Sequence, residues 1–128
     1  MDRALGFLFV GCAEGKLDVL DLNTGAQLGS ASSGSGVDII GYNHRLAHAY
    51  LPGAESATMA IIEISPKGAA TVLGTAKTAK GAHCVAADDR DDAYVCDPER
   101  GRLLIIKDLL RLRAYSAAGP QVSARRTE

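Results

Sequence analysis

The chain repeats one pattern three times: a short apolar run with an aromatic residue, a turn, and a second apolar run. Aligning Phe9, Tyr50 and Tyr94 gives offsets of 41 and 44 residues between the copies. A glycine-led run also recurs, at residues 36–40 and again 45 residues further on, at residues 81–85. A repeat of this length indicates an architecture that stacks one supersecondary unit beside the next.

The second apolar run of the pattern predicts a β-strand. In its first copy, residues 17–22, alternate residues fall on opposite sides, with Leu17, Val19 and Asp21 on one side and Asp18, Leu20 and Leu22 on the other. Alternation with period two over five or six residues, between turn-forming residues, is typical of a strand. The following Asn23-Thr24-Gly25 predicts a hairpin turn, because Gly25 can adopt a positive φ at no steric cost.

Four short strands per repeat, joined by short turns, are typical of a β-propeller blade. We therefore predict an all-β fold of four-stranded antiparallel blades, with one complete blade between two partial ones. The complete blade comprises residues 36–75, with strands near 37–42, 47–51, 58–64 and 70–75. The outer three strands of the preceding blade lie in residues 5–31, the following blade in residues 82–115, and a disordered tail in residues 116–128.

Residues 103–113 leave an alternative open, because their apolar spacing also fits one amphipathic helix. The two earlier copies of the pattern favour a strand at 103–107. Residues 109–115 stay undecided, although 110–115 could form the fourth strand of the last blade.

The glycine- and serine-rich segment 29–36 has Ser35 where a phosphate-binding loop requires lysine, so we expect it to connect two blades.

With this repeat laid out, the chain resembles the YVTN-type β-propeller proteins, a bacterial group. The residues that carry the likeness are Phe9-Val10-Gly11, Gly15–Gly25 (GKLDVLDLNTG), Gly36-Val37 and Gly81–Asp88 (GAHCVAAD). The likeness covers about residues 5–108, lacks the family's usual proline before the innermost strand, and does not extend past Asp108. Because one complete blade and two partial ones are fewer than a propeller needs, we predict a repeat module of a larger propeller that acts as a non-catalytic binding or interaction scaffold. The alternative is part of a propeller enzyme, a lactonase or a quinoprotein-like dehydrogenase, with a site in the central channel.

Asp38 and His83 are the candidate ligand-binding residues. They occupy matching positions in the two glycine-led runs, which the propeller interpretation makes the innermost strands around the channel. A carboxylate and an imidazole can bind a ligand there, or both can simply line a wet channel. Two such ligands are too few for metal catalysis, so we predict no catalytic residues, no metal and no cofactor.

The three cysteines match no zinc-binding spacing. Cys84 and Cys96 lie symmetrically about Arg90, so a hairpin centred there would place them opposite each other. We predict a reduced, buried pair, with a disulfide as the alternative. Zinc held by these cysteines and His83 is not expected, because strand alternation would send residues 83 and 84 to opposite faces.

Charge and hydropathy restrict the partners. The chain has 14 Lys and Arg against 15 Asp and Glu, which does not predict nucleic-acid binding, and its basic end at residues 109–128 is expected to be a frayed terminus. Apolar stretches are far too short to cross a bilayer, and no signal peptide is recognisable at the N-terminus, which leaves the compartment open.

The acidic turn 88–92 lacks the order of a calcium loop and is expected to be a solvated hairpin tip. Because single blades cannot bury both faces, the expected partners are other propeller blades or further copies of this chain.

Overall fold

The computed structural model of this chain describes residues 1–111. Within them, the chain forms ten β-strands: β1 (Phe7–Cys12), β2 (Lys16–Asp21), β3 (Gln27–Ser32), β4 (Gly41–Asn43), β5 (His48–Gly53), β6 (Thr58–Ile64), β7 (Ala70–Lys77), β8 (Val85–Ala87), β9 (Asp92–Asp97) and β10 (Arg102–Lys107). The predicted tail 116–128 and residues 112–115 of the undecided segment lie outside the described part. No helix long and apolar enough to cross a membrane occurs in residues 1–111.

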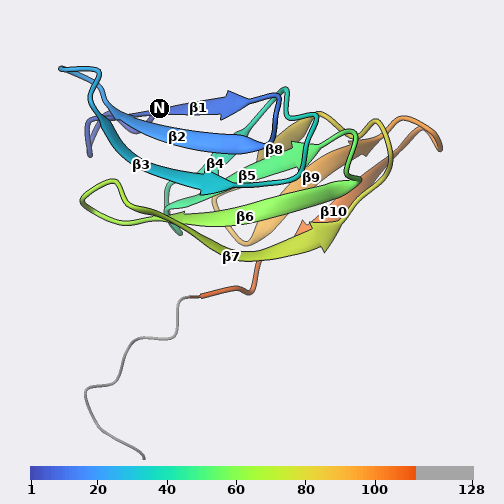
Figure 1. The fold of residues 1–128 in the computed structure, drawn as a ribbon. Helices are drawn as coiled ribbons and strands as arrows, with labels where there is room; N and C mark the ends of the chain where they lie inside the picture. The colour runs from blue at the N-terminus through green and yellow to red at the C-terminus, as the bar shows by residue number, and fades with distance from the viewer. Residues whose placement is uncertain (112–128) are drawn as a thin grey trace, which may run out of the picture.

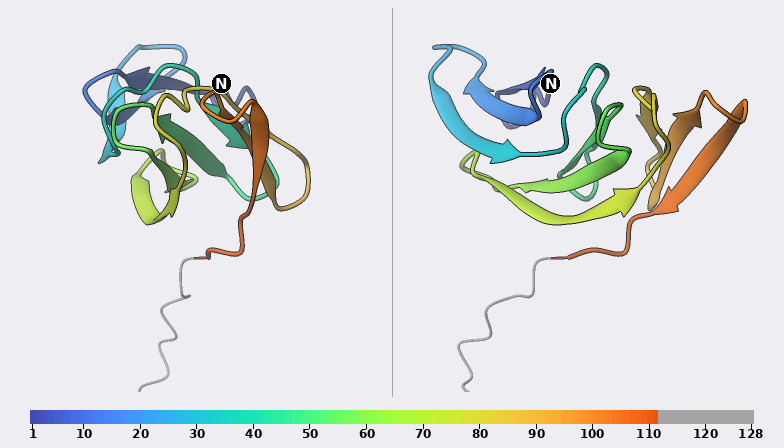
Figure 2. Two further views of the ribbon diagram at one scale, coloured as in Figure 1. Left: turned by 90° about the vertical axis from the view of Figure 1, so that its right-hand side faces the viewer. Right: turned by 45° about the vertical axis from the view of Figure 1, so that its right-hand side comes forward.

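The strands form three antiparallel sheets that follow one another along the chain (Figure 1). The first sheet has the order β1-β2-β3, the central sheet β4-β5-β6-β7 and the third sheet β8-β9-β10. Figure 2 shows the three sheets standing side by side in chain order. The predicted fold class is confirmed: an all-β chain with a four-stranded, blade-like sheet between two three-stranded ones.

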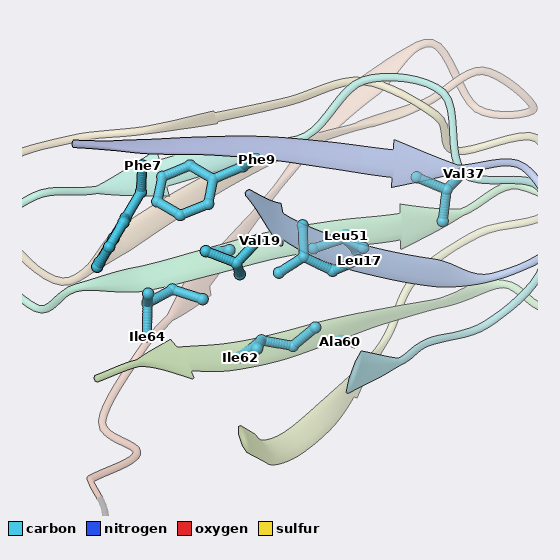
Figure 3. Close-up of a cluster of buried hydrophobic side chains, with 10 residues drawn as sticks. Phe7, Phe9, Leu17, Val19, Val37, Leu51, Ala60, Ile62 and Ile64 are labelled. Atoms are coloured by element: carbon cyan, nitrogen blue, oxygen red, sulfur yellow. The ribbon is translucent and has the colours of Figure 1, made fainter. Parts of the chain in front are cut away.

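The central sheet is buried on both faces, which explains why its middle strands are almost continuously apolar. One face packs on the first sheet, where Phe9, Leu17 and Val19 contact a row from β5 and β6 that includes Leu51 and Ile62 (Figure 3). The opposite face carries a second core, shared with the third sheet. Its buried members are Tyr50, Met59, Ile61, Ala79, Ala82, Val85, Ala93 and Val95. Alternate residues of β5 and β6 therefore serve two different cores.

The innermost strands are shorter than the sequence predicts. The predicted strand 37–42 is wrong over residues 37–40, because β4 contains only Gly41–Asn43 and Val37 makes an isolated bridge to Gly53. The segment 29–36 is not a connection throughout: Gly29–Ser32 belong to β3. That strand pairs with β2 up to Ser32 opposite Lys16, so tertiary pairing overrides the weak strand propensity of glycine and serine.

The strand predicted at 103–107 is confirmed as β10, whereas residues 108–111 adopt no regular structure. No helix therefore forms over the described part of 103–113. The hairpin β8–β9 also has the predicted centre, because Val85 pairs with Val95 and Ala87 with Ala93.

Each sheet has a left-handed residue at the same place in one hairpin turn, and the central sheet uses alanine there. Gly15, Ala57 and Gly101 occupy this position, with φ of 101°, 55° and 60°. A residue with a Cβ atom is strained by about 1–2 kcal/mol in this conformation.

We expect Ala57→Gly to raise the free energy of unfolding by about 0.5–1 kcal/mol, which urea denaturation followed by circular dichroism would measure. Relief of the left-handed strain exceeds the added flexibility of glycine in the unfolded chain. The matched control is Gly101→Ala, which places a Cβ in open space at the same turn position. It should destabilise the protein, and a destabilising Ala57→Gly would contradict the explanation.

Candidate functional site

The outer face of the third sheet carries exposed apolar side chains. On this face, which consists of Tyr94, Cys96, Leu103 and Ile105, the register places Leu103 opposite Cys96 and Ile105 opposite Tyr94. Leu103 and Ile105 are 64% and 65% exposed. Their neighbours Leu104 and Ile106 point the other way and pack on the second core.

Residues at equivalent repeat positions in the other two sheets are buried. Leu17 and Val19 in the first sheet, and Met59 and Ile61 in the central sheet, correspond to Leu103 and Ile105 by the offsets of 42 and 44 residues. All four are at most 3% exposed, because the next sheet along the chain covers them. The outer face thus has the side chains of a sheet interface, and no sheet lies against it in residues 1–111.

The structure brings the segments of Asp38 and His83 together, although neither residue lies on a strand. The backbone N–H of Ile39 donates to the carbonyl oxygen of His83 at 3.2 Å. Asp38 is exposed and precedes β4, whereas His83 is half-buried and precedes β8. The prediction that both lie on innermost strands is therefore wrong, because those strands begin only at Gly41 and Val85.

Cys84 and Cys96 lie opposite each other, as the symmetry about Arg90 predicts. The Cys96 N–H donates to the Cys84 carbonyl at 3.2 Å. In return the Cys84 N–H donates to the Cys96 sulfur at 3.3 Å. Both residues are free thiols and half-buried. They are less buried than predicted because they lie toward the outer face, against which no sheet packs in residues 1–111.

His83 lies beside this pair. One of its ring nitrogens and the sulfurs of Cys84 and Cys96 all lie within 4.8 Å of one another. The prediction that alternation separates His83 from the cysteines is wrong, because alternation applies to strands and β8 starts only at Val85. The sequence signal was present, since His83 adjoins Cys84 and the hairpin register brings in Cys96.

The two thiols have pKa values displaced in opposite directions. A hydrogen bond with Cys96 is the main cause that raises the pKa of Cys84, with burial and the negative charges of Cys96 and Asp38 adding to it. Burial also acts to raise the pKa of Cys96, but hydrogen bonds from the backbone of His83 and Cys84 outweigh it and lower that pKa. Of the two sulfurs, Cys96 is therefore the first to become a thiolate.

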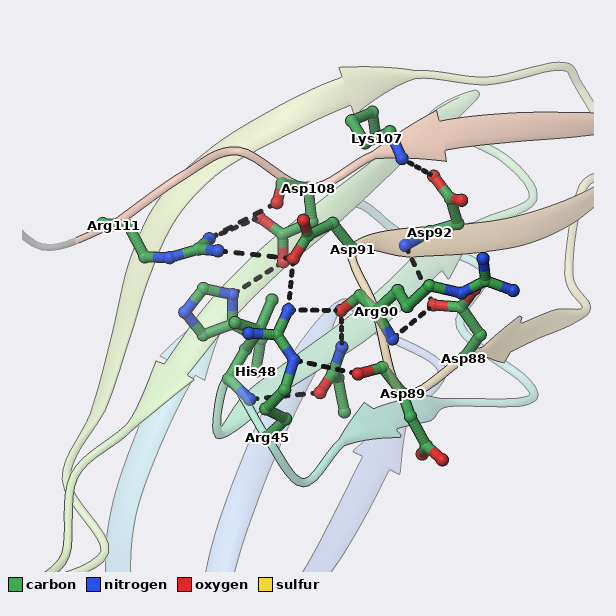
Figure 4. Close-up of polar contacts among 12 residues, drawn as sticks. Arg45, His48, Asp88, Asp89, Arg90, Asp91, Asp92, Lys107, Asp108 and Arg111 are labelled. Carbon is green, nitrogen blue, oxygen red and sulfur yellow. Dashed lines mark hydrogen bonds and ion pairs between the residues drawn. The ribbon is translucent and has the colours of Figure 1, made fainter.

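A buried polar network escaped the sequence analysis. Asp108, which follows β10, lies 2.7 Å from Nδ1 of His48 (Figure 4). It also accepts a hydrogen bond from the Tyr50 hydroxyl at 2.6 Å. All three side chains are at most 1% exposed. Burial and the bond to Asp108 raise the pKa of Tyr50 above its usual range. The network attaches the end of the third sheet to β5, which is a structural role.

The acidic turn 88–92 is paired with basic side chains (Figure 4). Asp91 pairs with Arg45 and, at 3.4 Å, with Arg111. Asp92 pairs with Lys107 at 2.9 Å. Asp88 accepts backbone N–H groups within the turn. The hairpin tip that we expected to be solvated is therefore also held by ion pairs and by hydrogen bonds within the turn.

Comparison with known proteins leaves the family open: no family model matches the chain, and no curated protein matches it. The candidate sites therefore rest on the structure of residues 1–111. They are the outer face of the third sheet and, at its inner end, the group formed by His83, Cys84 and Cys96.

Proposed function

We propose that this chain is a β-propeller repeat module, similar to YVTN-type propellers, that serves as an interaction scaffold. The outer face of its third sheet binds a further blade-like sheet. The single observation that carries this proposal is the contrast between Leu103, exposed, and its repeat equivalents Leu17 and Met59, which are fully buried beneath a following sheet.

A further sheet of the same type suits this face for a physical reason. Each interface within the chain pairs large apolar residues of one sheet with small and branched apolar residues of the next. The first sheet presents Leu8, Val10 and Leu20 on its own outer side, where β1 and β2 alternate away from the first core. In solution, the first sheet of a second copy is therefore a suitable occupant of the outer face, in a head-to-tail contact.

Ile105→Asp should abolish this association. Size-exclusion chromatography with light scattering should show that the unmodified chain forms oligomers as its concentration rises. A carboxylate at the centre of an apolar interface would be desolvated without a partner, at a cost of several kcal/mol. The variant should remain a monomer over the same concentration range.

The matched control is Leu109→Asp, which places the same charge at an equally exposed apolar residue outside the strands. This variant should associate like the unmodified chain. A chain that is monomeric at every concentration, or equal effects of the two substitutions, would contradict docking through the outer face.

A further inference from the structure

We infer that His83, Cys84 and Cys96 form a binding site for one zinc ion, with two thiolates and one imidazole as protein ligands. The site lies where the chain enters β8 and where β9 ends. It does not depend on docking at the outer face, because all three ligands come from a single hairpin.

The geometry needs little change to hold the metal. The three ligand atoms already lie within 4.8 Å of one another. In a tetrahedral site with zinc–sulfur bonds of about 2.3 Å and zinc–nitrogen bonds of about 2.0 Å, ligand atoms lie about 3.5–3.8 Å apart. The group must therefore contract by about 1 Å, which side-chain rotation can supply at half-buried positions.

Contacts around the ligands prepare two of them for a metal. Nδ1 of His83 lies 2.7 Å from the carbonyl oxygen of Gly81, so this nitrogen carries the proton and Nε2 keeps a free lone pair. A histidine that binds metal commonly donates its other N–H to a backbone carbonyl in this way. The Cys84 N–H points at the Cys96 sulfur at 3.3 Å, a bond that supports negative charge on that sulfur.

The ligand types select a soft or borderline cation. Thiolate and imidazole together favour zinc over magnesium or calcium, which prefer oxygen ligands. Three protein ligands leave the fourth tetrahedral position to water or to a carboxylate. Asp38 is a candidate for that carboxylate, because it is exposed and its neighbour Ile39 donates a backbone hydrogen bond to the His83 carbonyl.

Zinc binding at this site changes the oxidation state of neither the metal nor the protein. Zinc replaces the protons on the two thiols, which pass to solvent as two sulfur–zinc bonds and one nitrogen–zinc bond form. Oxidation of the same two cysteines to a disulfide would compete with metal binding, because it removes both thiolates. The site must therefore be tested in a reducing buffer.

The test uses the full chain in a phosphine reductant, with zinc chloride alone as the probe. Competition against a chromophoric chelator should give one zinc per chain. Cobalt chloride should give the absorption of a tetrahedral thiolate complex, with a sulfur-to-metal charge-transfer band. A reduced chain that binds no zinc, or cobalt spectra without thiolate absorption, would overturn the inference.

Variants identify the ligands. Cys84→Ser, Cys96→Ser and His83→Ala should each weaken zinc binding by at least tenfold. Cys12→Ser is the matched control, because Cys12 is the third half-buried thiol and ends β1 in the first sheet. It should leave the affinity unchanged. Circular dichroism of each variant excludes unfolding as the cause, and equal losses in Cys12→Ser and Cys96→Ser would reject the site.

Discussion

Leu17→Ala should lower the free energy of unfolding by about 3 kcal/mol, whereas Leu103→Ala should change it by less than about 0.5 kcal/mol. Both leucines occupy the same position of the repeat and both lie in strands. Leu17 is fully buried between the first and central sheets, and Leu103 is 64% exposed. Removing the Leu17 side chain leaves a cavity between the two sheets. Removing the Leu103 side chain leaves no cavity, because that side chain is mainly surrounded by water.

Urea unfolding of both variants measures this contrast. The experiment should use a protein concentration low enough to keep the chain monomeric, because docking at the outer face would also bury Leu103. Met59→Ala extends the series to the central sheet, where the equivalent side chain is fully buried, and it should resemble Leu17→Ala. Similar losses for Leu17→Ala and Leu103→Ala would show that the repeat position, not the covering sheet, sets the stability.

Asp108→Ala should lower the free energy of unfolding by about 3 kcal/mol, an effect comparable with the loss of a core leucine. The substitution leaves the Tyr50 hydroxyl and Nδ1 of His48 buried without the acceptor that now lies 2.6 and 2.7 Å away. Removing one partner from a buried polar group costs more than the hydrogen bond itself contributes.

Asp108→Asn is the matched control, because it keeps the size of the side chain and one carbonyl oxygen for Tyr50. It should lose about half as much stability as the alanine variant. A double-mutant cycle with Tyr50→Phe should give a coupling energy of about 1–3 kcal/mol. Additive effects in that cycle would contradict the network that the structure shows.

The sequence predicts the local elements better than their ends. Strand β6 has the predicted bounds, Thr58–Ile64, because its apolar run ends at Ser65 and Pro66. The innermost strands are shorter than predicted. The glycine-led segments have the sequence of an extended chain, but the sequence does not show whether a neighbouring strand pairs with them. β3 extends to Ser32, into the segment 29–36 that the sequence predicts as a connection, because its glycine and serine residues pair with β2.

Some of the candidate site residues could be placed from the sequence, and others could not. The hairpin register was readable from the sequence, and it places Cys84 opposite Cys96. The position of His83 beside these cysteines was not readable, because strand alternation does not govern a residue that precedes the strand. Asp108 and His48 lie 60 residues apart in the chain, and no local pattern connects them.

By itself, the sequence determined the repeat, the strands and the antiparallel hairpins, because these depend on spacing and turns between neighbouring residues. Only the tertiary structure decided which copies of one apolar position are buried. Leu17 and Leu103 carry the same local signal, yet burial requires a neighbouring sheet. Within residues 1–111 such a sheet lies against Leu17 and not against Leu103. Only the tertiary structure also decided the contacts of Asp108. A buried carboxylate needs hydrogen-bond donors, and here the packing of strands distant in the sequence brings them to it.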